Sequence, residues 1–216
     1  MAQQQQRNRR QPLTRDRIVE AALALADERG LDALSMRTLG QRVGVEAMSL
    51  YNHVANKDEV LDAIVELVLQ EIQPVSPEGD WSAALRTGAM SARSALLRHP
   101  WACAVWMQRM PGPYRLRYME GLLACLARSG LAPDIAHHAY HVIDTYIVGF
   151  TAQQATFLMT PDALAGVAAD FLHDLPTDEF PRVAAHVHEH LAGDESVSAF
   201  EFGLDLILDG LRRTAR

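Results

Sequence analysis

Two short amphipathic segments on either side of a single glycine constrain this chain more than any other feature. Ser35, a favoured N-cap residue, opens the first segment, and Gly44 stands where that helix would end. Glycine takes up the left-handed backbone of such a turn without steric cost. The inward apolar positions recur at helical spacing in both segments: Met36, Leu39, Val43, Leu50 and Val54. Residues 35–57 are therefore predicted to form two short helices joined by a tight turn.

The second of these helices, which begins at Glu46, leaves an unusual set of side chains on its outer face. The outward positions are Ala47, Met48, Ser49, Tyr51, Asn52 and His53. A helix face that only meets water usually carries more charge than this one. A polar face with little charge suits contact with base edges and phosphates. The pattern favours a helix-turn-helix that places its second helix in the major groove of DNA.

The distribution of charge supports a nucleic-acid partner, although the net charge of −7 alone argues against one. Residues 1–60 carry nine Lys and Arg against eight Asp and Glu, whereas residues 61–216 carry eleven against nineteen. Five arginines fall within residues 7–17. Residues 1–13, which are also rich in glutamine, are expected to form a disordered basic arm that meets phosphates. A solvated tail is the alternative interpretation of this arm.

The remainder of the chain shows helical periodicity and no alternating strand pattern, so we expect an all-α fold. Asn56 followed by Glu59 is typical of a capping box that opens a long helix with a broad apolar stripe. We place the boundary between two domains in this helix, with a three-helix domain at 14–61 and a larger domain at 62–216. Other helices are predicted at 14–30, 81–99, 101–110, 114–129, 133–159, 180–191 and 198–213, with a mobile or partly helical link at 160–180.

Two of the predicted helices carry more apolar surface than a single packed face requires. The helix at 198–213 is apolar on more than one side, and the helix at 133–159 combines apolar residues with small ones that allow close approach. Two such helices from each of two chains would form a four-helix dimer interface. Packing within one chain is the alternative.

Several classes of protein are disfavoured by what the sequence lacks. No apolar run is long enough for a membrane span and no signal peptide opens the chain, so a cytoplasmic protein without membrane contact is expected. Cys103 and Cys125 lie in apolar helical patterns and are expected to be buried. The i, i+4 histidine pairs at 137–141 and 186–190 are weak metal signals, and the motifs of enzymes are absent. We expect no catalysis, no cofactor and no metal.

The sequence resembles the TetR family of transcriptional repressors, most closely the tetracycline repressor branch. The resemblance is strong in the run Leu34-Ser35-Met36-Arg37-Thr38-Leu39-Gly40-Gln41-Arg42-Val43-Gly44-Val45 and in Ser49-Leu50-Tyr51-Asn52-His53-Val54-Ala55-Asn56-Lys57. It extends to the apolar run around Asp144–Phe150 and to the final helix from Phe200 to Leu211. The resemblance implies a homodimer with an N-terminal DNA-binding domain and a C-terminal ligand-binding and dimerisation domain.

The resemblance also assigns roles within the helix-turn-helix. It implies that Arg37 contacts DNA, that the recognition helix reads bases through Ala47, Met48, Ser49 and Asn52, and that phosphates are held by Tyr51, His53 and Lys57. Arginine can pair bidentately with guanine, and a lysine at a helix N-terminus is well placed for a phosphate. Ala47 and Met48 differ from the tetracycline repressor, so a different palindromic operator is expected.

The effector site implied by the resemblance departs from that of the tetracycline repressor. Positions that hold magnesium-bound tetracycline in that branch correspond here to Gln73, Trp106 and Arg109. We expect instead a pocket for a small hydrophobic or aromatic effector, lined by Trp106, Met107, Met110, Tyr114, His141, Asp144 and Tyr146. Ordinary core packing of these residues is the alternative.

The sequence therefore favours a homodimeric repressor that an effector releases from double-stranded operator DNA. The alternatives are an activator, a repressor with no ligand, and a helical ligand-binding protein or enzyme without sequence-specific DNA binding.

Overall fold

A computed structural model describes residues 12–156, 160–192 and 198–215, and the basic arm therefore lies almost wholly outside the described residues. This part of the chain is helical and contains no strand, as the all-α prediction requires. Its helices are α2 (Arg15–Arg29), η1 (Leu31–Ala33), α3 (Met36–Val43), α4 (Ala47–Leu50), α5 (Lys57–Gln70), α6 (Trp81–Arg98), α7 (Ala102–Gln108), α8 (Pro113–Ala127), α9 (Pro133–Thr156), α10 (Pro161–Asp174), α11 (Pro181–Ala192) and α12 (Ala199–Thr214).

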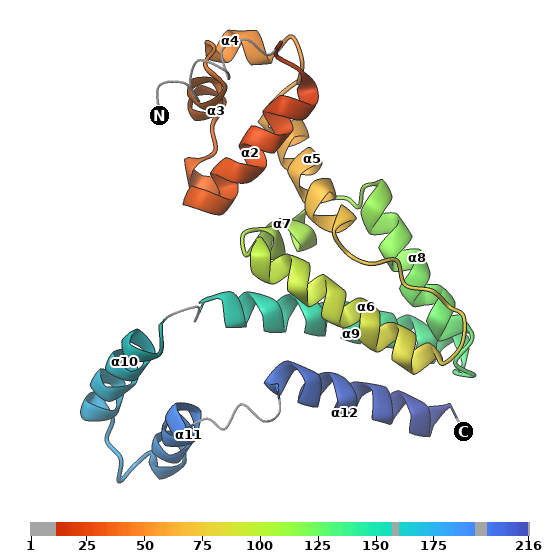
Figure 1. The fold of residues 1–216 in the computed structure, drawn as a ribbon. Helices are drawn as coiled ribbons and strands as arrows, with labels where there is room; N and C mark the ends of the chain where they lie inside the picture. The colour runs from red at the N-terminus through yellow and green to blue at the C-terminus, as the bar shows by residue number, and fades with distance from the viewer. Residues whose placement is uncertain (1–11, 157–159, 193–197, 216) are drawn as a thin grey trace.

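The helices α2, α3 and α4, with the beginning of α5, form an N-terminal unit at one end of the molecule (Figure 1). Thr14 caps α2 by accepting a hydrogen bond from the Arg17 N–H, and Gly30 ends that helix at a φ of 75°. The unit closes around its own apolar core, whose most deeply buried members are Ile18, Ala22, Leu39, Leu50 and Ile64. Because hydrophobic burial is the main stabilising contribution, this core fixes how the two short helices are presented.

The larger body is built from α6, α7, α8, α9 and α12 around a second apolar core. The long helix α5 runs out of the N-terminal unit into this body (Figure 1). Its residue Ile64 belongs to the N-terminal core, whereas Val65 and Val68 belong to the core of the body. The two cores are therefore connected by one continuous helix. Cys103 and Cys125 are buried in the body, as expected.

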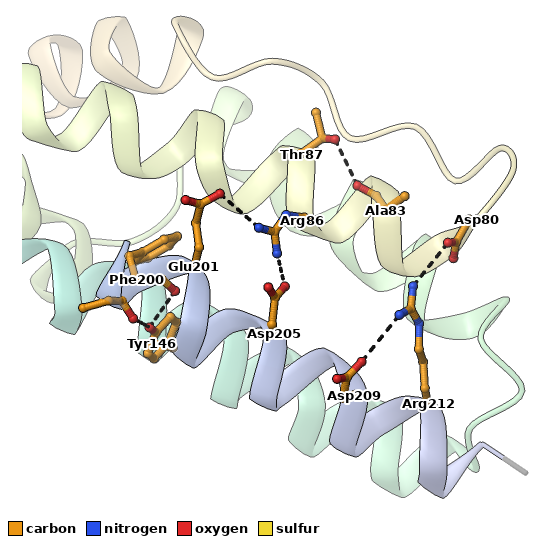
Figure 2. Close-up of polar contacts among 11 residues, drawn as sticks. Asp80, Ala83, Arg86, Thr87, Tyr146, Phe200, Glu201, Asp205, Asp209 and Arg212 are labelled. Atoms are coloured by element: carbon orange, nitrogen blue, oxygen red, sulfur yellow. Dashed lines mark hydrogen bonds and ion pairs between the residues drawn. The ribbon is translucent and has the colours of Figure 1, made fainter. Parts of the chain in front are cut away.

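The last helix, α12, is held against α6 and α9 by polar contacts along one side (Figure 2). Arg86 of α6 pairs with Glu201 at 3.0 Å and also with Asp205. The Tyr146 hydroxyl donates a hydrogen bond of 2.8 Å to the Phe200 carbonyl oxygen. These contacts orient α12 so that other apolar side chains on it face outwards.

The link at 160–180, expected to be mobile or partly helical, is partly helical. It contains a regular helix, α10, which packs on α11 as a pair that stands away from the body (Figure 1). The Thr160 hydroxyl caps α10 and Pro161 occupies its first position, two helix-start signals that the mixed composition obscured. The last predicted residues of the helix at 133–159 lie outside the described part. None of the described helices combines the length and apolarity needed to cross a lipid bilayer.

Candidate functional site

The turn between α3 and α4 has the geometry expected of a helix-turn-helix. Ser35 accepts a hydrogen bond of 3.1 Å from the Thr38 N–H, and Gly44 adopts a left-handed conformation with φ 80° and ψ 32°. Both local predictions are confirmed. Gly40 was not predicted to matter, yet a Cβ atom there would lie 2.9 Å from the Val45 carbonyl oxygen and 3.1 Å from the Ala47 nitrogen. A glycine inside a helix, four residues before the turn, was the available signal for this close approach.

The eight residues predicted to contact DNA all reach the surface of the N-terminal unit. The side chains of Met48 and Tyr51 are 75% and 46% exposed. Exposed residues also include Arg37, Asn52, His53 and Lys57, while Ala47 and Ser49 are half-buried. In the described part of the chain, the side chains of this face are therefore free to meet a partner.

The second helix of this pair is shorter than predicted. α4 ends at Leu50, and Tyr51, Asn52 and His53 form a turn that still carries a hydrogen bond of 3.0 Å from the Val54 N–H to the Leu50 carbonyl. The chain must leave the helix here because Asn56, the N-cap of α5, adopts an extended backbone conformation. The side chains after α4 are therefore presented from a turn.

Lys57 is the first residue of α5, at a helix start that is fully capped. The Asn56 side chain accepts a hydrogen bond of 2.8 Å from the Glu59 N–H, and Glu59 accepts one of 2.7 Å from the Ala55 N–H. The Ala55 N–H and then Arg15 lower the pKa of the Glu59 carboxyl. Lys57 is therefore held on a rigid helix start, where the positive end of the helix dipole adds to its charge.

Several arginines near this face have structural partners. Arg15 pairs with Glu59 at 3.0 Å, and Arg17 donates to the Val43 carbonyl at the end of α3 at 3.1 Å. The Arg42 guanidinium donates two hydrogen bonds, of 2.5 and 2.6 Å, to the Glu28 carboxylate and so forms a bidentate pair. The described arginines of the segment at 7–17 thus brace the N-terminal unit, a role that their charge alone did not reveal.

A cavity of about 590 Å³ lies at the junction of the N-terminal unit and the body. Its walls come from α2, α5, α7 and α8. Three of the predicted effector residues line it: Trp106, Met110 and Tyr114. The volume falls in the range of small-molecule sites, and the lining combines apolar surface with carboxylates and guanidinium groups. A compound bound here would touch helices of both units.

Two polar links cross the rim of this cavity. Glu66 of α5 accepts a hydrogen bond of 2.7 Å from the Tyr114 N–H, which caps the otherwise uncapped start of α8. Arg109, at the end of α7, pairs with Asp58 at 3.1 Å and with Asp62. Both links join α5 to the segment between α7 and α8, so movement of that segment pulls on the helix that leads to Lys57.

Three of the other four predicted effector residues lie in three different places. Met107 is 64% exposed and lines a separate groove of about 540 Å³ between α7 and α9. His141 is exposed on α9, with its ring 4.7 Å from that of His137. Tyr146 lies apart from the cavity, because it packs on Phe200 and holds α12. Met107, His141 and Tyr146 therefore do not line the junction cavity, since α7 and α9 present these side chains in different directions.

Asp144 lies in a partly buried polar cluster, the quartet, with three residues of α7 and α8: Trp106, Arg115 and Tyr118. The Trp106 and Tyr118 rings meet edge to face at 5.7 Å, and the Arg115 guanidinium lies 5.4 Å from the Trp106 ring. Burial raises the pKa of the Asp144 carboxyl, while the charge of Arg115 and the indole of Trp106 act in the opposite direction. Burial and the charge of Asp144 raise the pKa of the Tyr118 hydroxyl. Arg115 and Tyr118 were not among the residues predicted from the sequence.

The described residues contain no group of three or more histidine, cysteine, aspartate or glutamate side chains arranged to hold a metal ion. The histidine pairs on α9 and α11 are on exposed helix faces, with ring separations of 4.7 Å for His137 and His141 and 6.2 Å for His186 and His190.

Family profiles match both parts of the chain. Residues 18–64 match the profile described as bacterial regulatory proteins, tetR family, and residues 73–215 match the tetracyclin repressor-like C-terminal domain. Together they cover the N-terminal unit and almost the whole body.

Individual proteins resemble the chain along most of its length. The HTH-type transcriptional repressor DrrR1 of Streptomyces coeruleorubidus is 34% identical, over 92% of this chain and 77% of its own. The class A tetracycline repressor of Escherichia coli is 30% identical, over 91% of this chain and 89% of its own. The crystal structure of ActR from Streptomyces coelicolor in complex with actinorhodin superposes with a TM-score of 0.74 at 35% identity, covering 93% of this chain and 95% of that one.

Proposed function

We propose a division of labour among the residues of this chain, which belongs to the tetR family of bacterial regulatory proteins and is a transcriptional repressor. The N-terminal unit, residues 14–61, binds the operator. The body, residues 62–216, binds the effector and the second subunit, with the boundary between the two domains in α5. The observation that carries this proposal is the position of α5, which begins at Lys57 beside the DNA-binding face and ends in the core of the body.

On the DNA-binding face, base reading is assigned to Arg37, Ala47, Met48, Ser49 and Asn52. Arg37 on α3 has a guanidinium group suited to guanine, whereas Met48 offers only apolar contact, such as with a thymine methyl group. Tyr51, His53 and Lys57 hold the phosphate backbone. The exposure of all three side chains supports this assignment.

The repressor acts as a homodimer through α9 and α12, so that two recognition helices read successive major grooves of a palindromic operator. Contacts on one side of α12 leave Phe202 and Leu206 59% and 57% exposed on the other. Val142 of α9 is 50% exposed. Burial of these side chains against the same surface of a second subunit would give a symmetric interface.

A small aromatic or hydrophobic effector binds in the cavity between the units. ActR is described in complex with actinorhodin, and a tetR-family repressor of Acinetobacter baumannii in complex with minocycline. Here the effector contacts Trp106, Met110 and Tyr114 and displaces the α7–α8 segment, which Glu66 and Arg109 connect to α5. An effector that prefers the displaced arrangement shifts the population away from the DNA-binding state.

A footprinting experiment tests the proposal. The purified protein is expected to protect a palindromic sequence in the DNA upstream of its own gene, with affinity that falls steeply as salt rises. Tyr51→Ala and Lys57→Ala should weaken this binding without changing the oligomeric state. Arg128→Ala, at an exposed position after α8 in the body, is the matched control and should bind as the wild type does. Unchanged affinity in both test variants would refute the assigned face.

A further inference from the structure

Glu46 is the only acidic residue of the segment 35–57, whose other charged residues are Arg37, Arg42 and Lys57. It is exposed, and within the described part of the chain its side chain forms no hydrogen bond and no ion pair. Glu46 was not predicted from the sequence to contact DNA. A free carboxylate on a surface that meets phosphates opposes DNA binding unless a hydrogen-bond donor of the DNA offsets the repulsion.

The backbone of Glu46 is fixed at the start of α4. Its carbonyl oxygen accepts a hydrogen bond of 2.9 Å from the Ser49 N–H, and the preceding Val45 N–H donates one of 2.9 Å to the Gly40 carbonyl oxygen. Val45 and Ala47, which flank Glu46, are also the residues whose backbone atoms pack on Gly40. Helix α4 lies at the outer end of the N-terminal unit, away from the body (Figure 1). The Glu46 side chain therefore starts from a fixed point beside the residues assigned to base reading.

Glu46 occupies the N-cap position of α4 without capping that helix, since its side chain accepts no hydrogen bond there. The helices α2, α3 and α5 of the same unit begin with Thr14, Ser35 and Asn56, whose side chains each accept a hydrogen bond from a backbone N–H. These three are favoured capping residues. The carboxylate of Glu46 is thus left over for a contact outside the chain.

The major groove offers a carboxylate one well-matched partner. The hydrogen-bond donors on the base edges there are the N4 amine of cytosine and the N6 amine of adenine. Adenine presents the acceptor N7 beside its amine, which asparagine and glutamine match but a carboxylate, itself only an acceptor, does not. Cytosine presents its amine without an acceptor beside it, so the carboxylate fits cytosine better.

We propose that Glu46 is a specificity-determining residue that accepts a hydrogen bond from the N4 amine of one cytosine in each operator half-site. The inference rests on the proposed function, in which α4 enters the major groove. It adds a cytosine contact to the base contacts assigned to Arg37 and Met48. Because the carboxylate is compensated at the operator and repelled by phosphates elsewhere, Glu46 weakens binding to other DNA more than it strengthens binding to the operator.

Gel-shift titrations with the full-length protein test this contact on the operator that footprinting identifies. In a set of duplexes, each base pair of one half-site is replaced in turn by its transition, C·G by T·A or A·T by G·C, which exchanges an amine for a carbonyl group in the major groove. The wild type is expected to lose at least about tenfold in affinity at one C·G pair. Glu46→Ala should lose nothing at that pair and should keep the wild-type losses at every other. On a scrambled duplex Glu46→Ala should bind more tightly than the wild type, because a like charge has been removed.

Three results would overturn the inference alone. Equal tightening by Glu46→Ala on every duplex would show that Glu46 only repels phosphates. Discrimination lost at an A·T pair would exclude cytosine as the partner. A lowered midpoint of thermal unfolding with the base preferences intact would show that Glu46 only stabilises the start of α4 through the helix dipole.

Glu120→Ala is the matched control, because it removes one exposed carboxylate from α8, outside the N-terminal unit. It should reproduce the wild-type affinities on every duplex. Glu120→Ala with the same altered preferences as Glu46→Ala would also overturn the assignment, since the effect would then follow from net charge. A wild-type protein that binds the operator no more tightly than the scrambled duplex refutes the proposed function, and this inference with it.

Discussion

His99, which ends α6, joins the body to the N-terminal unit, since its Nδ1 lies 2.7 Å from Oδ1 of Asp27 on α2. The other ring nitrogen of His99 lies 3.1 Å from a carboxylate oxygen of Glu71, just after α5. The Trp101 indole donates a hydrogen bond of 2.7 Å to the same oxygen of Asp27. His99 is only 8% exposed, whereas Asp27 and Glu71 reach the surface, so these contacts form a seam between the two units with His99 at its buried centre.

Replacing His99 with phenylalanine is expected to destabilise the protein by about 1–3 kcal/mol, because two carboxylates lose a buried partner. Operator affinity should change little, since His99 contacts none of the residues on the DNA-binding face. Chemical denaturation followed by circular dichroism measures the first effect, and gel shift the second. His188→Phe, at an exposed position on α11, is the control and should leave the stability close to that of the wild type. Equal stability of the two variants would show that the seam is not structural.

The seam also gives the stability of the protein a defined dependence on pH. Burial raises the pKa of the Glu71 carboxyl, but hydrogen bonds from Arg98 and His99 outweigh it and lower the pKa below its ordinary value of 4.5. A lowered pKa in the folded state means that the contribution of Glu71 is complete above pH 4.5 and is lost as the pH falls through the folded-state pKa. Glu71→Gln should therefore be less stable than the wild type at neutral pH, and the difference should shrink on acidification. Denaturant titrations of both proteins across this range provide the measurement, and a difference that grows towards low pH would contradict the assignment.

A methyl group added at Gly40 would meet neighbouring backbone atoms, whereas one added at Gly44 would lie in open space. At Gly44 nothing lies within 4 Å of the position that a Cβ atom would occupy, so Gly44→Ala costs only the left-handed backbone, about 1–2 kcal/mol. At Gly40 the backbone is helical, but the methyl group would press on the Val45 carbonyl oxygen and the Ala47 nitrogen. Backbone atoms cannot turn aside, so Gly40→Ala should separate α3 from α4 and cost about 1–3 kcal/mol.

The two variants differ in function as well as in stability. Gly40→Ala should weaken operator binding in conditions where the protein is fully folded, because the recognition helix is displaced. Gly44→Ala should bind normally once it is folded, since no atom is pushed aside. Thermal unfolding combined with gel shift separates the two effects. Normal operator binding by folded Gly40→Ala would show that the turn tolerates the wider spacing.

Replacing Arg37 with alanine and replacing Lys57 with alanine are expected to change DNA binding in different ways. Loss of a phosphate contact at Lys57 should weaken binding to all sequences alike and reduce the slope of log affinity against log salt by about 1. Loss of a base contact at Arg37 should cost about 1–3 kcal/mol on the operator and relax the preference at one base pair. Titrations of the operator and a scrambled duplex at several salt concentrations distinguish these outcomes. Identical salt slopes and identical specificity in the two variants would refute the division between base reading and phosphate holding.

Features set by neighbouring residues could be predicted from the sequence, because caps and turns depend on local backbone chemistry. Ser35, Gly44 and Asn56 all perform the predicted roles, and the helical periodicity located most helices to within a few residues. The end of α4 was harder to place, since it depends on the extended backbone that Asn56 requires rather than on α4 itself.

Features that depend on contacts between distant helices could not be predicted. Trp106, Tyr118 and Asp144 come from three different helices, and only the packing of α7 and α8 against α9 brings them together. Tyr146 follows Asp144 by two residues, yet it points to α12 because successive positions on a helix face different directions. The close approach at Gly40 could not be predicted for the same reason, because the atoms near it belong to residues on the other side of the turn.

Phe202 and Leu206 of α12 provide the test of the dimer interface. They lie one helical turn apart and are 59% and 57% exposed, whereas Glu201 and Asp205 of the same helix contact Arg86 (Figure 2). Replacing both with glutamate places two like charges at the centre of the proposed interface without touching the core of the monomer.

The double variant is expected to sediment as a monomer at concentrations where the wild type is a dimer, because desolvating unpaired carboxylates opposes association. Its operator affinity should fall by far more than that of any single DNA-face variant, since each subunit then binds one half-site alone. Leu116→Glu, at a 52% exposed position on α8, introduces a similar charge away from α9 and α12 and should remain dimeric. If the double variant stays dimeric and Leu116→Glu does not, the subunits associate through α8, and the proposed arrangement of the two recognition helices must be abandoned.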